Sequence, residues 1–176
     1  MAAFLAVLTP EADTVVGHLR ERWDPAVQRG LGAHITLRYP FLPFKALSTR
    51  DRDKLADVVA SVPSFHYTLA RVSHFPSTVF LDPEPASPFT ALRTAVDQAF
   101  EQHLPEDPFP KYVPHLSVAR HVRGARAEVL AALDSALAGS GGAIRAACKA
   151  VVLLERIGGG SWQVQLHVPL GQARPI

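Results

Sequence analysis

Two short motifs in this chain each combine an imidazole with a hydroxyl group. His34 lies two residues before Thr36, and His115 lies two residues before Ser117. Residues i and i+2 of a β-strand point to the same face, so each motif presents both groups side by side. Histidine titrates near neutral pH, so one imidazole could activate water while the other protonates a departing sugar oxygen. The hydroxyls could donate to the non-bridging oxygens of a phosphate, and this set therefore suits phosphodiester chemistry.

The two motifs occupy matching places in a repeated order of elements. The histidines are 81 residues apart (115 − 34 = 81), and helices predicted to end near Trp23 and Leu104 each stop 11 residues before a histidine. The approximate repeats, 2–75 and 77–169, each read strand, helix, strand, helix, strand. One extra strand closes the second repeat. Such spacing indicates a diverged duplication. We therefore expect one domain, 1–176, of two lobes related by a pseudo-twofold axis, with the histidine strands face to face.

The elements that must position these groups follow from hydrophobic periodicity and turn residues. Helices are expected at about Glu11–Arg22, Thr49–Val62, from Ser87 onward, and at about Ala125–Leu137. Strands are expected at Ala2–Leu8, Ala33–Tyr39, Phe65–Phe75, Thr78–Leu81, His115–Val122, Ile144–Glu155 and Ser161–Val168.

Other side chains near the motifs are candidates for binding a substrate. Arg38 is four residues after His34 and should share its face, whereas Arg120 is five residues after His115 and should point away unless the strand bulges. A base could stack on one of the nearby aromatic rings. We favour Phe41 and Tyr112 from a set that comprises Tyr39, Phe41, Phe44, Phe75, Phe109 and Tyr112.

Composition excludes several classes of protein. A formal net charge of +2 and the lack of a Lys/Arg run do not give a long nucleic-acid footprint, although a ligand with one phosphate needs only a few donors. The single cysteine, Cys148, excludes a disulfide framework and a cysteine-based zinc motif. The apolar start, 2–8, lacks a basic region and is too short for a signal or a membrane span, so we expect a cytoplasmic protein.

The segments AHITLRYPF and VPHLSVAR resemble the paired H-x-T/S signatures of the 2H phosphoesterase superfamily, also called 2′-5′ RNA ligase-like proteins. The resemblance extends over nearly the whole chain, including HFPSTVFLDPEP and the terminal W-x-V-x-L-x-V-P-L segment. Ala33 stands where relatives often have proline, and Ser117 replaces the commoner threonine. The resemblance implies a bilobal α+β fold with two mainly antiparallel sheets, flanking helices and a central groove.

The resemblance also implies an activity: metal-independent hydrolysis of 2′,3′-cyclic phosphates or 2′-5′ linkages, with an RNA terminus or a small cyclic nucleotide as substrate. His34 would be the proton donor and His115 the acceptor. No metal, cofactor, membrane or obligate protein partner is expected. The alternative is a nucleotide- or RNA-binding module without turnover. A histidine-based metal protein is a weaker third possibility, because two histidines without nearby carboxylates make a poor ligand set.

Overall fold

The computed structural model describes residues 2–109 and 111–172, which form eight β-strands, four α-helices and three short 3₁₀ helices. In chain order these are β1 (Ala3–Leu8), α1 (Pro10–Trp23), η1 (Val27–Arg29), β2 (His34–Arg38), η2 (Phe44–Ala46), α2 (Thr49–Ala60), β3 (Phe65–His74), β4 (Thr78–Glu84), α3 (Ser87–Phe100), β5 (Leu116–Arg120), α4 (Arg126–Gly139), β6 (Ile144–Cys148), β7 (Ala150–Arg156), η3 (Ile157–Gly159) and β8 (Trp162–Pro169).

All eight strands belong to one curled antiparallel sheet in the order β6-β3-β4-β5-β2-β1-β7-β8. The α+β class is therefore confirmed, but the expected division into two sheets is wrong. The histidine strands β2 and β5 are neighbours at the centre, and the pair Ile35 and Leu116 joins the two four-stranded halves. The two motifs thus lie side by side in one sheet.

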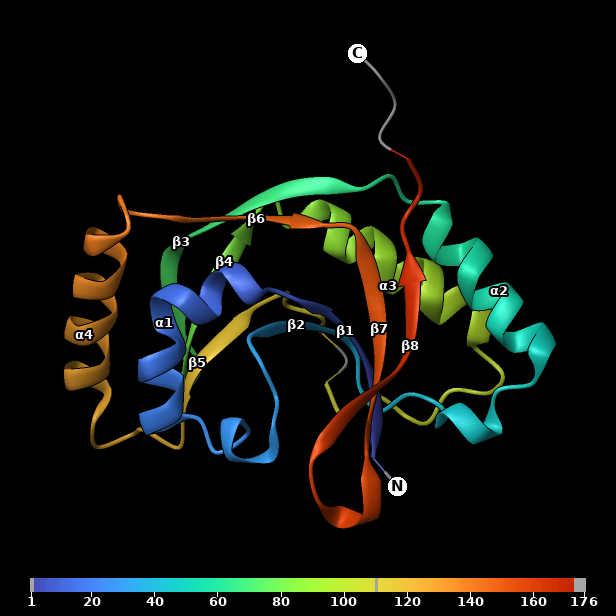
Figure 1. The fold of residues 1–176 in the computed structure, drawn as a ribbon, viewed down its shortest axis with the longest axis horizontal. Helices are drawn as coiled ribbons and strands as arrows, with labels where there is room; N and C mark the ends of the chain where they lie inside the picture. The colour runs from blue at the N-terminus through green and yellow to red at the C-terminus, as the bar shows by residue number, and fades with distance from the viewer. Residues whose placement is uncertain (1, 110, 173–176) are drawn as a thin grey trace.

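The two halves of the sheet have matching strand orders. Outward from the centre, one half runs β2, β1, β7, β8 and the other runs β5, β4, β3, β6. The helices form two pairs, α1 with α4 and α2 with α3, at opposite ends of the sheet (Figure 1). Each pair contains one helix from each predicted repeat.

The four helices cover one face of the sheet. The buried residues of all four belong to one apolar core, which also contains Ile35, Leu37, Leu116 and Val118 from the histidine strands. A second, smaller apolar cluster lies on the other face, which we call the helix-free face. Its buried members are Phe4, Ala6, Leu31, Val152 and Leu154.

Local sequence explains where several elements begin and end. Ser48 caps α2 as expected, because its hydroxyl accepts from the Asp51 amide at 3.1 Å and the Asp51 carboxylate accepts from the Ser48 amide at 3.0 Å. The single strand expected over 144–155 is instead two strands, β6 and β7, separated at Lys149. The chain bends sharply there to pass from one half of the sheet to the other (Figure 1).

Among the described residues, none of the helices has the length and apolar content needed to cross a membrane.

Candidate active site

The register of β2 and β5 brings the four motif side chains together. Ile35 and Leu116 form the antiparallel pair between β2 and β5. Continuing this register by one residue on each side places His34 opposite Ser117, and Thr36 opposite His115, which directly precedes β5. All four point away from the core that holds the paired residues, onto the helix-free face. Opposed Cβ atoms are about 4.5–5.5 Å apart and diagonal ones roughly 7–8 Å. The two imidazoles are diagonal neighbours in this register, and a separation of roughly 5–8 Å between them remains a prediction.

Both imidazoles are held in the same way by their own backbone. His34 Nδ1 lies 2.8 Å from the carbonyl oxygen of Gly32, and His115 Nδ1 lies 2.8 Å from that of Val113. A carbonyl oxygen can only accept, so Nδ1 carries the hydrogen in each ring. Nε2 of each neutral imidazole therefore keeps its lone pair for the exchange of a proton.

Burial shapes the titration of both histidines. His34 is only 5% exposed, and burial lowers its pKa to about 4, against a raising effect of the Gly32 hydrogen bond and a further lowering by Arg120. Burial also lowers the pKa of His115, again with the Arg120 charge in the same direction. Both rings are therefore neutral at pH 7 in the free protein. A phosphate anion beside them would raise both pKa values.

A β-bulge occurs at the same place in both histidine strands. In β2 the pairing with β1 shifts between Arg38 and Thr36, and in β5 the pairing with β4 shifts between Ala119 and Ser117. A bulge adds one residue, so the alternation of faces changes after it. The residue four positions after each histidine consequently turns toward the helices, and the residue five positions after it returns to the helix-free face.

Arg38 therefore lies on the helix-covered face, and its expected position beside His34 is wrong. Its guanidinium is buried and forms ion pairs with the Asp107 carboxylate at 3.0 Å and the Asp97 carboxylate at 3.3 Å. It also donates a hydrogen bond to the Pro105 carbonyl oxygen at 2.5 Å. Arg93 binds the same two carboxylates. The arginine thus fastens the loop before β5 to α3 and β2, and its donors face away from the histidines.

Arg120 is on the helix-free face, as the bulge allows. It pairs across the strands with Thr78, which shares a face with Phe80. Its Nε lies 3.4 Å from the buried Asp24 carboxylate, while its side chain remains 38% exposed. Arg120 also lines a cavity of about 560 Å³ between the end of α1 and the segment after β5, with Asp24 and Val122 in the same lining. Its positive charge contributes to lowering the pKa of both histidines.

The two favoured aromatic residues do not present a free ring to this site. Phe41 is 2% exposed and packs edge-on against Phe100 in the main core. The Tyr112 hydroxyl donates to the Thr36 carbonyl oxygen at 3.0 Å, and the Arg93 guanidinium covers its ring. Tyr112 therefore supports the backbone of β2, and burial raises its pKa. The prediction of a ligand role for these two rings rests on their closeness in sequence to the motifs, and closeness in sequence does not determine the face of the sheet.

Other aromatic rings surround the histidines. Phe4 lies 5.6 Å from the His34 ring, and Tyr39 and Trp162 pack edge-on against Phe4 at 6.2 Å and 4.8 Å. Tyr39 is five residues after His34, so it is the counterpart of Arg120. The sequence alone could have indicated this position for Tyr39, because an alignment of the two motifs on their histidines matches Tyr39 with Arg120.

On the other side, the Phe80 and Phe75 rings lie 5.0 Å and 5.2 Å from the His115 ring. Phe80 stands opposite Ser117 in the sheet, so its place on the histidine face could be read only once the pairing of β4 with β5 was known.

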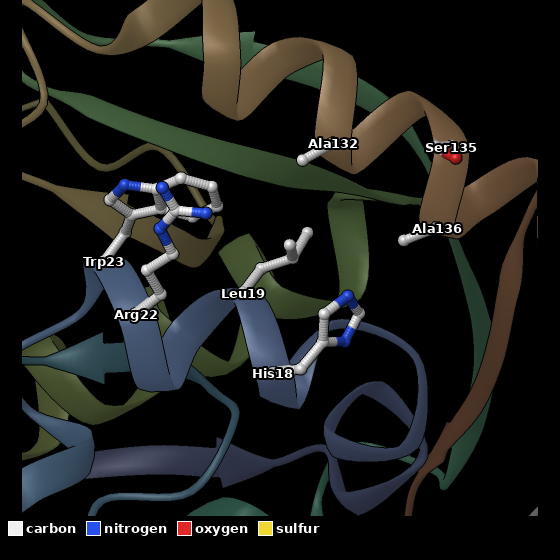
Figure 2. A pocket seen from close by; sticks show the side chains of 7 residues that line it. All are labelled: His18, Leu19, Arg22, Trp23, Ala132, Ser135 and Ala136. Carbon is white, nitrogen blue, oxygen red and sulfur yellow. The ribbon is translucent and has the colours of Figure 1, made fainter.

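A separate cavity of about 390 Å³ lies between α1 and α4 (Figure 2). His18, Leu19, Arg22 and Trp23 line it from α1, and the Arg22 guanidinium lies over the Trp23 ring, 4.4 Å from its centroid. Since both helices pack on the helix-covered face, this cavity is distinct from the site that the two motifs form.

Comparison with known proteins places the fold and the family. The structure is similar to Escherichia coli LigT complexed with 3′-AMP, with a TM-score of 0.63 and 17% identity over 97% of this chain and 98% of that chain. A Thermus thermophilus protein gives a TM-score of 0.63 and 16% identity over 99% and 100% of the two chains. No curated protein sequence matches this chain. A family model described as the 2′-5′ RNA ligase superfamily matches residues 8–160, and the chain therefore belongs to that superfamily of phosphoesterases.

Proposed function

We propose that this protein is a phosphodiesterase that hydrolyses 2′,3′-cyclic phosphates or 2′-5′ linkages of RNA ends or nucleotides by acid–base catalysis. The observation that carries the proposal is the arrangement of the two imidazoles. His34 and His115 share the helix-free face of adjacent strands, and a backbone carbonyl at 2.8 Å holds each Nδ1. This leaves two Nε2 atoms for one acid and one base, the pair that hydrolysis of a phosphodiester requires.

The reaction of a cyclic phosphate illustrates the roles. Neutral His115 accepts a proton from water through Nε2 as the water oxygen bonds to phosphorus. The bond from phosphorus to one ribose oxygen breaks, and protonated His34 gives its Nε2 proton to that oxygen. The products are a phosphomonoester and a free hydroxyl, and proton exchange with solvent restores the two imidazoles. The anionic substrate favours the protonated form of His34, which burial disfavours in the free protein.

Three further side chains have roles in this proposal. Thr36 stands opposite His115 and Ser117 stands opposite His34, so each hydroxyl is near the imidazole of the other strand. They donate hydrogen bonds to the non-bridging oxygens, whose negative charge grows in the transition state. Arg120 supplies a positive charge near both histidines and binds the phosphate or the rest of the substrate.

Structures of the similar LigT support a nucleotide as the ligand. LigT has been crystallised in complexes with 3′-AMP, NADP⁺, ATP and phosphate. At 16–17% identity, the likeness to the 3′-AMP and NADP⁺ complexes shows the shared fold. A nucleotide-binding module without turnover would need the same face for its ligand, but it would not need two imidazoles with free Nε2 atoms.

One panel of substrates tests the proposal. Purified protein is incubated in EDTA with 2′,3′-cyclic nucleotides, 2′-5′-linked dinucleotides and oligonucleotides that carry cyclic ends, and the position of the product phosphate is determined. We expect turnover that survives chelation, because two histidines supply acid and base. Binding of these ligands without any product would favour the binding module. Turnover that EDTA abolishes and zinc restores would replace the mechanism with a metal-assisted one.

A further inference from the structure

The peptide bond between Gly32 and Ala33 is held at both of its polar atoms. Its carbonyl oxygen lies 2.8 Å from His34 Nδ1. Its N–H, which belongs to Ala33, donates to both carboxylate oxygens of Asp13 at 3.1 Å. A peptide unit is planar, so a group that fixes the N–H also fixes the direction of the carbonyl. The Asp13 carboxylate therefore acts on the oxygen that anchors the His34 ring.

A buried arginine holds the Asp13 carboxylate in place. Arg20, on the same helix α1, is 1% exposed, and its Nη1 donates to Asp13 Oδ1 at 3.1 Å. Its Nη2 donates to the Asp24 carboxylate and to the Leu31 carbonyl oxygen, each at 3.1 Å. Gly32 leaves room for the carboxylate, because a Cβ there would lie 3.2 Å from Asp13 Oδ2. The carboxylate is thus fixed between a guanidinium and the peptide that it binds.

The second histidine is anchored by a peptide of a different kind. His115 Nδ1 lies 2.8 Å from the Val113 carbonyl oxygen. The next residue is Pro114, at the position that Ala33 has in the first half. Proline has no N–H, but its ring fixes its own φ and restricts the residue before it. A glycine followed by an alanine lacks both restrictions, and in the first half the Asp13 carboxylate stands in their place.

We propose that Asp13 is a positioning residue for His34. It fixes the Gly32–Ala33 peptide as the proline ring fixes the corresponding peptide in the second half. This inference rests on the proposed function, in which His34 gives its Nε2 proton to the leaving oxygen. The carboxylate also polarises the peptide, so that the carbonyl becomes a stronger acceptor for Nδ1–H. Asp13 thereby keeps the hydrogen on Nδ1 and the ring in one orientation, without touching the substrate itself.

The tautomer of His34 tests the proposal without any substrate. In the wild type at pH 7, ¹⁵N NMR should show Nδ1–H in both His34 and His115, with the signals assigned from variants of each histidine. In Asp13→Ala the His34 ring should move toward the Nε2–H form that free imidazole side chains prefer in water, while His115 keeps its form. The matched control is Asp51→Ala, because both aspartates lie in the first turn of a helix and accept a backbone amide. This control should leave both rings unchanged.

Kinetics on adenosine 2′,3′-cyclic phosphate supply a second readout. Asp13→Ala should lower kcat by about 10- to 10²-fold, the cost of a misplaced acid, and leave KM within about twofold. The double variant Asp13→Ala/Ala33→Pro should recover the Nδ1–H tautomer and most of kcat, because proline restores the restraint found before His115. Circular dichroism checks folding. If Asp13→Ala does not fold, Asp13→Asn, which keeps the shape of the side chain but loses its charge, takes its place.

Three results would overturn the inference. One is a His34 tautomer that the Asp13 variant leaves unchanged. Another is the same change of tautomer in Asp51→Ala, which would show a general loss of stability. The third is a folded double variant whose His34 ring stays as in Asp13→Ala, since Asp13 would then not act through the peptide. If the wild type turned over no substrate, the proposed function would fail, and the tautomer would still decide the role of Asp13.

Discussion

The strands β2 and β5 have the same backbone geometry around their histidines but differ in the side chains that follow them. Both carry a histidine anchored to the carbonyl two residues before it, a hydroxyl two residues after it, and a bulge. Beyond the bulge, the aromatic Tyr39 directly follows β2 on the helix-free face, whereas the cationic Arg120 ends β5 on the same face. In the proposed mechanism the motifs preserve the geometry of the reacting groups, while the fifth position would set what each half contributes to binding.

The two arginines of this region show why the bulge matters. Arg38 is buried between two aspartates on the helix-covered face, and Arg120 is partly exposed beside the histidines. They differ by one position in the motif. A single added residue in a strand therefore separates an arginine that stabilises the fold from one available to a substrate.

The largest effect is expected from the histidines themselves. Replacing His34 or His115 with Ala removes the acid or the base, and each change should lower kcat by about 10²–10⁴-fold. Because one turnover uses both groups, the double variant should be little worse than the poorer single variant. Steady-state rates on a 2′,3′-cyclic nucleotide, with folding checked by circular dichroism, measure this. Multiplication of the two losses in the double variant would show that the groups act independently.

Arg38→Met should lower stability, whereas Arg120→Met should lower activity. Loss of the buried Arg38 leaves Asp97 and Asp107 short of a partner, so the free energy of unfolding should fall on the order of 3 kcal/mol. Loss of Arg120 should instead lower kcat/KM by about 10²-fold, because a donor to the substrate is removed. Urea unfolding and steady-state kinetics on both variants separate the two roles. The opposite pattern would mean that the faces have been assigned wrongly.

Stability should fall on acidification because of His34. Its pKa is about 4 in the folded protein and 6.5 when unfolded, so between these values the unfolded chain binds the extra proton. The free energy of unfolding should therefore decrease from pH 6.5 to pH 4, with about 3 kcal/mol from this group alone. Urea unfolding at pH 7 and pH 4.5 should show a smaller decrease in His34→Gln than in the wild type. An equal decrease in both proteins would place the titrating group elsewhere.

The hydroxyl variants should lose no more activity than Arg120→Met, and less where water replaces the hydroxyl. Thr36→Ala and Ser117→Ala each remove one donor to the phosphate, which costs on the order of 10²-fold in kcat at a dry site and less where water substitutes. The Ser117 side chain is buried at 7% exposure, so water should replace its hydroxyl less easily than it replaces that of Thr36. Thr36→Ser and Ser117→Thr keep the hydroxyl and should retain most activity. Loss of activity in these two conservative variants would indicate a packing role.

The alternation of apolar and polar residues along the two histidine strands was enough to predict that each histidine shares a face with its hydroxyl. The alternation of apolar and polar residues gave β2, β5 and the shared face of each histidine with its hydroxyl. It failed for Arg38 because alternation cannot reveal a bulge, which depends on the partner strand. It also read β6 and β7 as one strand, because the bend at Lys149 follows from the curl of the sheet rather than from a local turn residue.

The aromatic surroundings of the site were predicted less well. Phe41 and Tyr112 are close in sequence to the motifs, yet Phe41 belongs to the main core and the Tyr112 hydroxyl donates to a carbonyl oxygen of β2. Phe4 and Phe80 come from neighbouring strands, so their contact with the imidazoles depends on sheet order. The division into repeats 2–75 and 77–169 remains a prediction.

The pH dependence of kcat/KM tests the two-histidine mechanism most directly. The base must be neutral, so the rate falls at low pH, and the acid must be protonated, so it falls at high pH. Since burial lowers the pKa of both histidines, both limbs of the bell should lie below pH 6.5, while the optimum of kcat should be more alkaline because the bound anion raises both pKa values. His115→Ala should lose the acidic limb and His34→Ala the alkaline limb. A complete bell retained by either variant would contradict the mechanism.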